Sequence, residues 1–208
     1  MSTSASATKT KPIARNLRWR VVDIVVASVL GVAAGLIFLA WNTLYQGPKL
    51  LLEPLLPGLQ GLLDGPWLFA GVLGALIIRK PGAAIYTELL AAVVSALIGN
   101  QWGGFLTLEA GFIQGLGAEI IFLIFAYRVW NLPVAILAGM GAALAGGINN
   151  LILWFAGADA LFTVVYLIST VVSGAVIAGL LSWLLARGIA RTGALDRFGS
   201  GRDVSVRV

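Results

Sequence analysis

Two carboxylic acids, Glu88 and Glu119, stand inside apolar stretches of this 208-residue chain. Glu88 lies in the run IYTELLAAVVSALIGN, and Glu119 ends the run GFIQGLGAE, which also contains Gln114. A carboxylate at the centre of a membrane costs about 2.5–3.5 kcal/mol on insertion scales, so acidic residues at that depth indicate a function. Such a residue binds a cation, carries a proton or joins two helices.

Other polar side chains occur at helical spacing in the later apolar stretches. Asn149 and Asn150 are adjacent amides, and each amide needs several hydrogen-bond partners. With a rise of about 1.5 Å per residue, both asparagines fall in the outer half of their helix, as do Gln114 and Tyr166 in theirs. We predict a substrate site there, completed by residues at the outer helix ends: Trp41, Asn42, Trp67 and Trp102.

Each of these residues also has a structural interpretation. The paired asparagines could bridge two helices, and the tryptophans could anchor the chain at the membrane interface. Glu88 lies about one and a half turns from the inner end of its stretch, which favours a structural or conformational role. Glu119 lies near the middle of its stretch, so it is the first candidate for a ligand-binding carboxylate.

The composition is that of an integral membrane protein. Hydrophobic residues make up 59% of the chain and charged residues 11%, and the mean hydropathy is +0.95. Soluble domains carry about 25% charged residues. The chain has no histidine and no cysteine, which excludes zinc, haem and iron–sulfur sites and Ser-His or Cys-His nucleophiles. We therefore expect no metal centre or cofactor of these kinds.

Hydropathy predicts an all-α bundle of six transmembrane helices in a single domain, residues 19–193. A helix needs about 20 apolar residues to cross the hydrocarbon. The six predicted spans are residues 19–45, 67–78, 82–98, 105–127, 132–155 and 161–186. Four prolines break the apolar outer loop between the first two spans, residues 46–66. Residues 1–18 and 194–208 are predicted to be disordered basic tails.

The positive residues indicate the orientation. In an arrangement with both termini inside, 13 of the 14 Lys and Arg residues lie on the cytoplasmic side, and only Lys49 lies outside. We therefore predict a multi-pass protein of a prokaryotic cytoplasmic membrane, with both termini in the cytoplasm. The net charge of +5 resides at helix ends and tails, which argues for the lipid bilayer as its partner and against nucleic acid.

The chain is similar to YkoE-type S components. The similarity lies in its six spans and in two stretches, IRKPGAAIYTELLAAVVSALIGN and GFIQGLGAE. S components are the substrate-binding subunits of energy-coupling-factor (ECF) vitamin transporters, and the YkoE type is associated with thiamine or its hydroxymethylpyrimidine moiety. The resemblance covers most of residues 19–195. It implies a membrane-embedded capture subunit without catalytic activity, whose ligand lies near the outer face beneath the first outer loop.

The same resemblance implies partners. A transmembrane T component and two ATPase subunits would complete the transporter. The small-residue face Ala27, Gly31 and Gly35 would dock on the T component. A thiamine-like ligand also fits the residues, because a carboxylate and aromatic faces stabilise its thiazolium cation, while amides complement its aminopyrimidine edge.

Two other functions are open from the residues alone. In the first, the chain is a proton-coupled secondary transporter that uses Glu88 or Glu119 as its proton carrier. In the second, it is a structural membrane subunit whose internal carboxylates hold partners together. No convincing inverted repeat relates the two halves of the chain, which disfavours the secondary transporter.

Overall fold

The computed structural model describes residues 17–201, and all regular structure in that range is helical. Most of the two predicted tails, residues 1–16 and 202–208, lies outside it. In chain order the elements are α1 (Val21–Leu44), α2 (Gln46–Leu52), the 3-10 helices η1 (Leu59–Leu63) and η2 (Gly65–Trp67), α3 (Phe69–Ile78), α4 (Ala83–Ile98), α5 (Gly104–Ile124), α6 (Leu132–Leu153), α7 (Ala160–Ser173), the π-helical η3 (Gly174–Leu181) and α8 (Ser182–Arg191).

Four helices in this range are long and apolar enough to cross a membrane: Val21–Leu44, Gly104–Ile124, Leu132–Leu153 and the continuous helix Ala160–Arg191. Two shorter apolar helices, Phe69–Ile78 and Ala83–Ile98, lie between them. The helical fold class is confirmed for the described residues. Six spans and a common side for both termini remain predictions.

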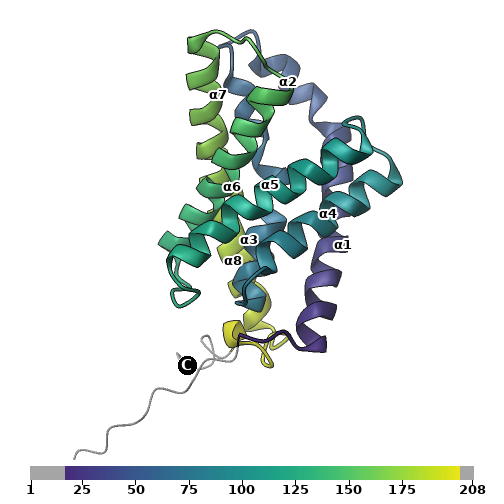
Figure 1. Ribbon diagram of the computed structural model, residues 1–208, viewed down its shortest axis with the longest axis vertical. Coiled ribbons are helices and arrows are strands. Elements are labelled where there is room, and N and C mark those ends of the chain that lie inside the picture. The colour runs from purple at the N-terminus through teal and green to yellow at the C-terminus, as the bar shows by residue number, and fades with distance from the viewer. Residues whose placement is uncertain (1–16, 202–208) are drawn as a thin grey trace, which may run out of the picture.

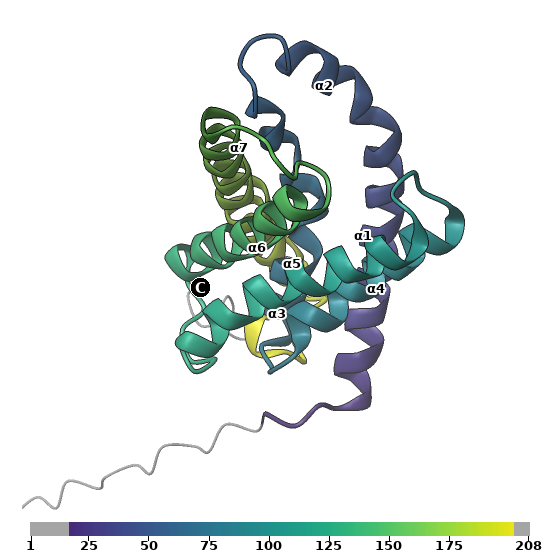
Figure 2. The same ribbon diagram turned by 45° about the horizontal axis from the view of Figure 1, so that its top comes forward.

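The helices form one bundle with two distinct ends (Figures 1 and 2). We call the end that carries the first and last described segments the terminal end, and the opposite end, where α2 and the α6–α7 connection lie, the cavity end. α4 and α5 run side by side and slant across α1. α3 lies at the centre, because every residue from Ala70 to Ile78 is buried.

α1 and α4 pack closely through the small-residue face of α1. Ala27, Gly31 and Gly35 are all buried. A Cβ atom added to Gly35 would lie 2.6 Å from Val94 and 2.8 Å from the carbonyl oxygen of Ala91. Small residues allow membrane helices to approach this closely. In this structure α4 of the same chain covers the face that was predicted to dock a partner subunit.

The terminal end is held together by charged residues around Asp23. This fully buried carboxylate accepts hydrogen bonds from the backbone and guanidinium of Arg20 and forms an ion pair with Lys80. The last described residues also pack here, with Leu195 and Phe198 each only 4% exposed. Residues 194–201 therefore do not match the predicted disordered tail, because their two apolar side chains join the core of the bundle.

Candidate functional site

A cavity of about 320 Å³ opens at the cavity end of the bundle. This volume lies at the lower limit for sites that enclose small organic molecules, which are about 300–1,000 Å³. Its walls come from α1, α2, η1, η2 and α4 to α7, together with the connections beside them. The lining residues are Phe38, Asn42, Tyr45, Lys49, Gln60, Asp64, Trp67, Leu68, Ala92, Ser95, Trp102, Leu106, Thr107, Ala110, Gly111, Gln114, Gly146, Gly147, Asn150, Trp154, Phe155, Tyr166 and Thr170.

One wall of the cavity is the segment from Gly58 to Gly65, which is fixed against α7. Gly58 has a φ of 92°, and a Cβ atom there would lie 2.6 Å from the carbonyl oxygen of Phe162. The Ser173 hydroxyl donates to the Leu62 carbonyl at 2.6 Å and accepts from the Gly65 amide at 3.0 Å. The backbone of this wall therefore packs directly on α7.

Among residues 17–201, Asp64 is the only acidic residue that lines the cavity. Its carboxylate accepts hydrogen bonds from the Tyr166 hydroxyl at 2.6 Å and the Thr170 hydroxyl at 3.1 Å. The amide of Asn150 in turn donates to the Tyr166 hydroxyl at 2.8 Å. Asp64 belongs to the connection between η1 and η2, where its removal from bulk water raises the pKa of the carboxyl to about 6 despite these hydrogen bonds. The side chain is a fixed anionic centre at neutral pH.

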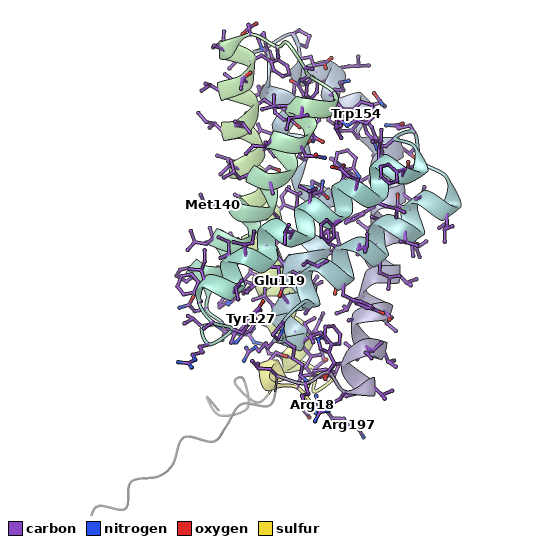
Figure 3. All side chains as sticks on the ribbon, viewed as in Figure 1. Arg18, Glu119, Tyr127, Met140, Trp154 and Arg197 are labelled. Carbon is purple, nitrogen blue, oxygen red and sulfur yellow. The ribbon has the colours of Figure 1, made fainter. Side chains whose placement is uncertain are left out.

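Four aromatic side chains form a cage beside this carboxylate. Trp67 lies 5.1 Å from Tyr45 and 5.9 Å from Trp102, measured between ring centroids, and Trp102 lies 6.0 Å from Trp154. All three pairs meet edge to face. Such aromatic walls attract organic cations through their ring quadrupoles. Trp154 marks this end of the bundle in Figure 3.

Comparison with known proteins agrees with a transporter subunit. Residues 22–145 match the family described as the permease component of an ABC-type cobalt transport system. YkoE of Bacillus subtilis (strain 168), which carries the name HMP/thiamine permease protein, is 34% identical over 187 residues, 89% of this chain and 92% of YkoE. A solved structure of an S component of an ECF transporter superposes with a TM-score of 0.84 at 32% identity, covering 91% of this chain and 95% of that one.

The chain belongs to the S components of ECF transporters. Its relatives are transporter subunits and not enzymes, as the sequence predicted. The match extends over both the α1–α4 face and the cavity end, because the aligned part covers about nine-tenths of the chain. The aligned part therefore includes most of the elements that surround the cavity.

Six of the ten predicted substrate-binding residues line the cavity of this S component. They are Asn42, Trp67, Trp102, Gln114, Asn150 and Tyr166. The sequence could predict that these side chains lie together, because the spacing of residues along a helix and their distance from its end can be counted. Whether they contact a ligand remains a prediction.

The other four predicted residues do not line the cavity. Trp41 donates its indole N–H to the Leu63 carbonyl at 3.0 Å, behind the cavity wall. Asn149 donates to Glu109 at 2.9 Å. Glu88 lies buried beneath the cavity, where it accepts a hydrogen bond from the Gly71 amide in the first turn of α3 at 2.6 Å. It therefore caps a helix that begins inside the bundle.

Glu119 lies at the other end of α5 from the cavity. Its carboxylate accepts hydrogen bonds from the amides of Gly82 and Ala84 at 2.6 and 2.9 Å, and from the Tyr127 hydroxyl at 2.7 Å. Figure 3 shows Glu119 and Tyr127 nearer the terminal end, far from Trp154. Glu119, the first candidate for the ligand-binding carboxylate in the sequence, thus lies outside the cavity and caps the N-terminus of α4.

Sequence reasoning missed Asp64. The sequence holds one signal that points to it, namely a single acidic residue in the apolar run LLPGLQGLLDGP of the outer loop. An acidic residue in such a run is as unusual as one within a span. The close approach of this loop to α7, which encloses Asp64, depends on tertiary contacts that helical periodicity does not describe.

Asn42 orients two tryptophans of the cage. Its side-chain oxygen accepts the indole N–H groups of Trp67 and Trp102 at 2.8 and 3.1 Å, and its amide nitrogen donates to Ser95 at 3.1 Å. We expect Asn42→Leu to lower the free energy of unfolding by about 2 kcal/mol, because two indole donors lose their acceptor. Tryptophan emission should shift to longer wavelength as the indoles become mobile and hydrated.

The control for this variant is Thr43→Val at the neighbouring exposed position, whose hydroxyl bonds only to the Leu39 carbonyl of its own helix. Thermal unfolding in detergent and fluorescence spectra measure both effects. An Asn42→Leu protein with the stability and emission of the Thr43→Val control would show that Asn42 does not hold the cage.

Proposed function

We propose that this S component captures thiamine, or the hydroxymethylpyrimidine half of thiamine, for import by an ECF transporter. The observation that carries the proposal is the single carboxylate of Asp64 in a cavity walled by aromatic side chains. Thiamine supplies a fixed positive charge for that carboxylate and a flat heteroaromatic cation for the cage. The name of the Bacillus relative supports the same ligand class.

The donor groups of the cavity favour an organic cation over a metal ion. Divalent cobalt prefers several imidazole, thiolate or carboxylate ligands. The chain has no histidine or cysteine, and in residues 17–201 no group of three or more acidic side chains could hold a metal. The cavity offers one carboxylate, amides and indole rings, which match the charge and hydrogen-bonding groups of thiamine. Its lining ammonium, Lys49, forms an ion pair with Glu53 at 3.4 Å.

In the proposed arrangement six spans cross the membrane, both termini are cytoplasmic, and the cavity faces outward. Arg18 and Arg197 lie together at the terminal end, which agrees with the positive-inside rule for that end (Figure 3). A transmembrane T component and two ATPase subunits would then energise import. The S components among its relatives support this assembly in general terms.

Calorimetry on the detergent-purified protein tests the ligand. We expect thiamine to bind at least tenfold more tightly than hydroxymethylpyrimidine, because only thiamine carries the cation that the cage and Asp64 attract. Choline serves as a control cation without a pyrimidine and should bind more weakly than thiamine. A purified protein that shows neither binding heat nor a raised unfolding temperature with thiamine would rule out the proposed ligand.

The affinity for thiamine should depend on pH. A proton and the thiazolium cation compete for the Asp64 carboxylate, whose pKa is raised to about 6 by its enclosure. The carboxylate is mostly ionised at pH 7.5 and mostly protonated at pH 5, so thiamine should bind about tenfold more weakly at pH 5. Calorimetric titrations at both pH values measure this change. An affinity that rises on acidification would contradict a role for Asp64 as the counter-charge.

A further inference from the structure

Gln60 lines the cavity, and its buried side-chain oxygen has no hydrogen-bond partner in the described part of the chain. Its oxygen is one of two buried side-chain polar atoms in that part without a partner, and the other belongs to Glu88. Glu88 does not line the cavity. Buried polar atoms are nearly always paired in proteins, and an unpaired acceptor in a site wall indicates a group that the ligand satisfies.

The backbone that carries Gln60 is fixed in position. Gln60 lies in η1, and the next residue, Gly61, packs so closely on α7 that a Cβ atom there would lie 2.6 Å from the Thr170 hydroxyl. Gln60 itself is only 3% exposed. The terminal torsion of a glutamine side chain is broad, so the amide turns without moving the backbone. The amide is thus held at one place but free to choose which of its atoms faces the ligand.

An amide offers one acceptor and one donor side by side. The edge of a 4-aminopyrimidine offers the complementary pair, an amino donor beside a ring-nitrogen acceptor. Glutamine and asparagine amides read the equivalent edge of adenine in the same bidentate way. The Asp64 carboxylate cannot do this, since an ionised carboxylate only accepts hydrogen bonds.

We propose that Gln60 is a specificity-determining residue, whose amide accepts a hydrogen bond from the amino group of the ligand's pyrimidine and donates one to the adjacent ring nitrogen. The proposal rests on the proposed function, because it assumes a ligand that carries this ring. In this arrangement Gln60 selects the pyrimidine ring of the ligand, and Asp64 balances the positive charge of its thiazolium ring.

Ligand fragments distinguish these two roles. The probes are thiamine, the uncharged hydroxymethylpyrimidine and a thiazolium salt that lacks the pyrimidine, each titrated by tryptophan fluorescence. Gln60→Met keeps the length of the side chain but removes both hydrogen bonds. We expect it to weaken thiamine and hydroxymethylpyrimidine by the same factor, at least tenfold, and to change thiazolium binding by less than threefold.

Asp64→Asn provides the reciprocal comparison, because it should weaken the two thiazolium ligands more than hydroxymethylpyrimidine. Gln46→Met on exposed α2 is the matched control and should leave all three affinities unchanged. Unchanged thiamine affinity in Gln60→Met, or an equal loss for the thiazolium salt, would overturn the role of Gln60. A wild-type protein that binds none of the three probes would instead overturn the proposed function.

Discussion

Replacement of Asp64 by asparagine should weaken thiamine binding about 100-fold at pH 7.5, the largest effect of any single substitution in the cavity. Asparagine preserves the shape of the side chain and an oxygen for the hydroxyls of Tyr166 and Thr170, which bond to Asp64 at 2.6 and 3.1 Å. It removes the negative charge. A charge-assisted contact in an enclosed site contributes up to about 3 kcal/mol, and each 1.4 kcal/mol is a factor of ten in affinity.

The same substitution should raise the unfolding temperature of the protein without ligand. The pKa of Asp64 is about 6 in the folded protein, above the ordinary value of 3.8. A carboxyl with a raised pKa stabilises the fold fully below its unfolded pKa, and this stabilisation is lost as the pH rises through 6. At pH 7.5 the ionised carboxylate therefore costs stability, and asparagine removes that cost. A residue kept at the expense of stability is expected in a binding site.

Glu53→Gln is the matched control for the charge. Glu53 is exposed, lies at the end of α2 in the same outer loop, residues 46–66, and forms an ion pair with Lys49 at 3.4 Å. We expect its removal to change thiamine affinity by less than threefold, because exposed ion pairs contribute little. Calorimetry at pH 7.5 and pH 5 should also show that Asp64→Asn abolishes most of the pH dependence. An Asp64→Asn protein that binds thiamine with full affinity would refute the role of Asp64 as the counter-charge of the ligand.

The helical stretches and much of the cavity follow from the sequence, because hydropathy and helical spacing are local properties. The predicted fourth span, residues 105–127, appears as α5, Gly104–Ile124. Gln114, Asn150 and Tyr166 were placed in the outer half from their positions along their helices, and all three line the cavity. Residues within one helix keep a fixed spacing, so their relative depth can be counted from the sequence.

The contacts of Glu119 could not be obtained in this way. Counting residues places it near the middle of the membrane, but α5 slants across the bundle and the start of α4 lies against it (Figure 1). Helix tilt depends on packing with neighbours and cannot be read from the length of an apolar run. Likewise, the position of Asp64 depends on Gly61 meeting Thr170, a contact between residues more than a hundred positions apart.

Replacement of Glu119 by leucine should destabilise the fold without weakening the ligand site. The carboxylate is 6% exposed and accepts three hydrogen bonds, two of them from the start of α4 and one from Tyr127. Leucine leaves all three donors without an acceptor, which should lower the free energy of unfolding by about 4 kcal/mol. Chemical unfolding of the detergent-purified variant, followed by circular dichroism, measures this loss.

Tyr127→Phe separates the contributions to this cap. It removes one of the three donors and leaves the carboxylate on the amides of Gly82 and Ala84, so the expected loss is only about 1 kcal/mol. In both variants the folded fraction should bind thiamine within threefold of the wild type, since the cavity lies at the other end of α5. The opposite result, a stable Glu119→Leu protein that no longer binds thiamine, would return Glu119 to the ligand site. Because capping and ligand binding predict changes in different quantities, stability and affinity measured on one preparation decide between them.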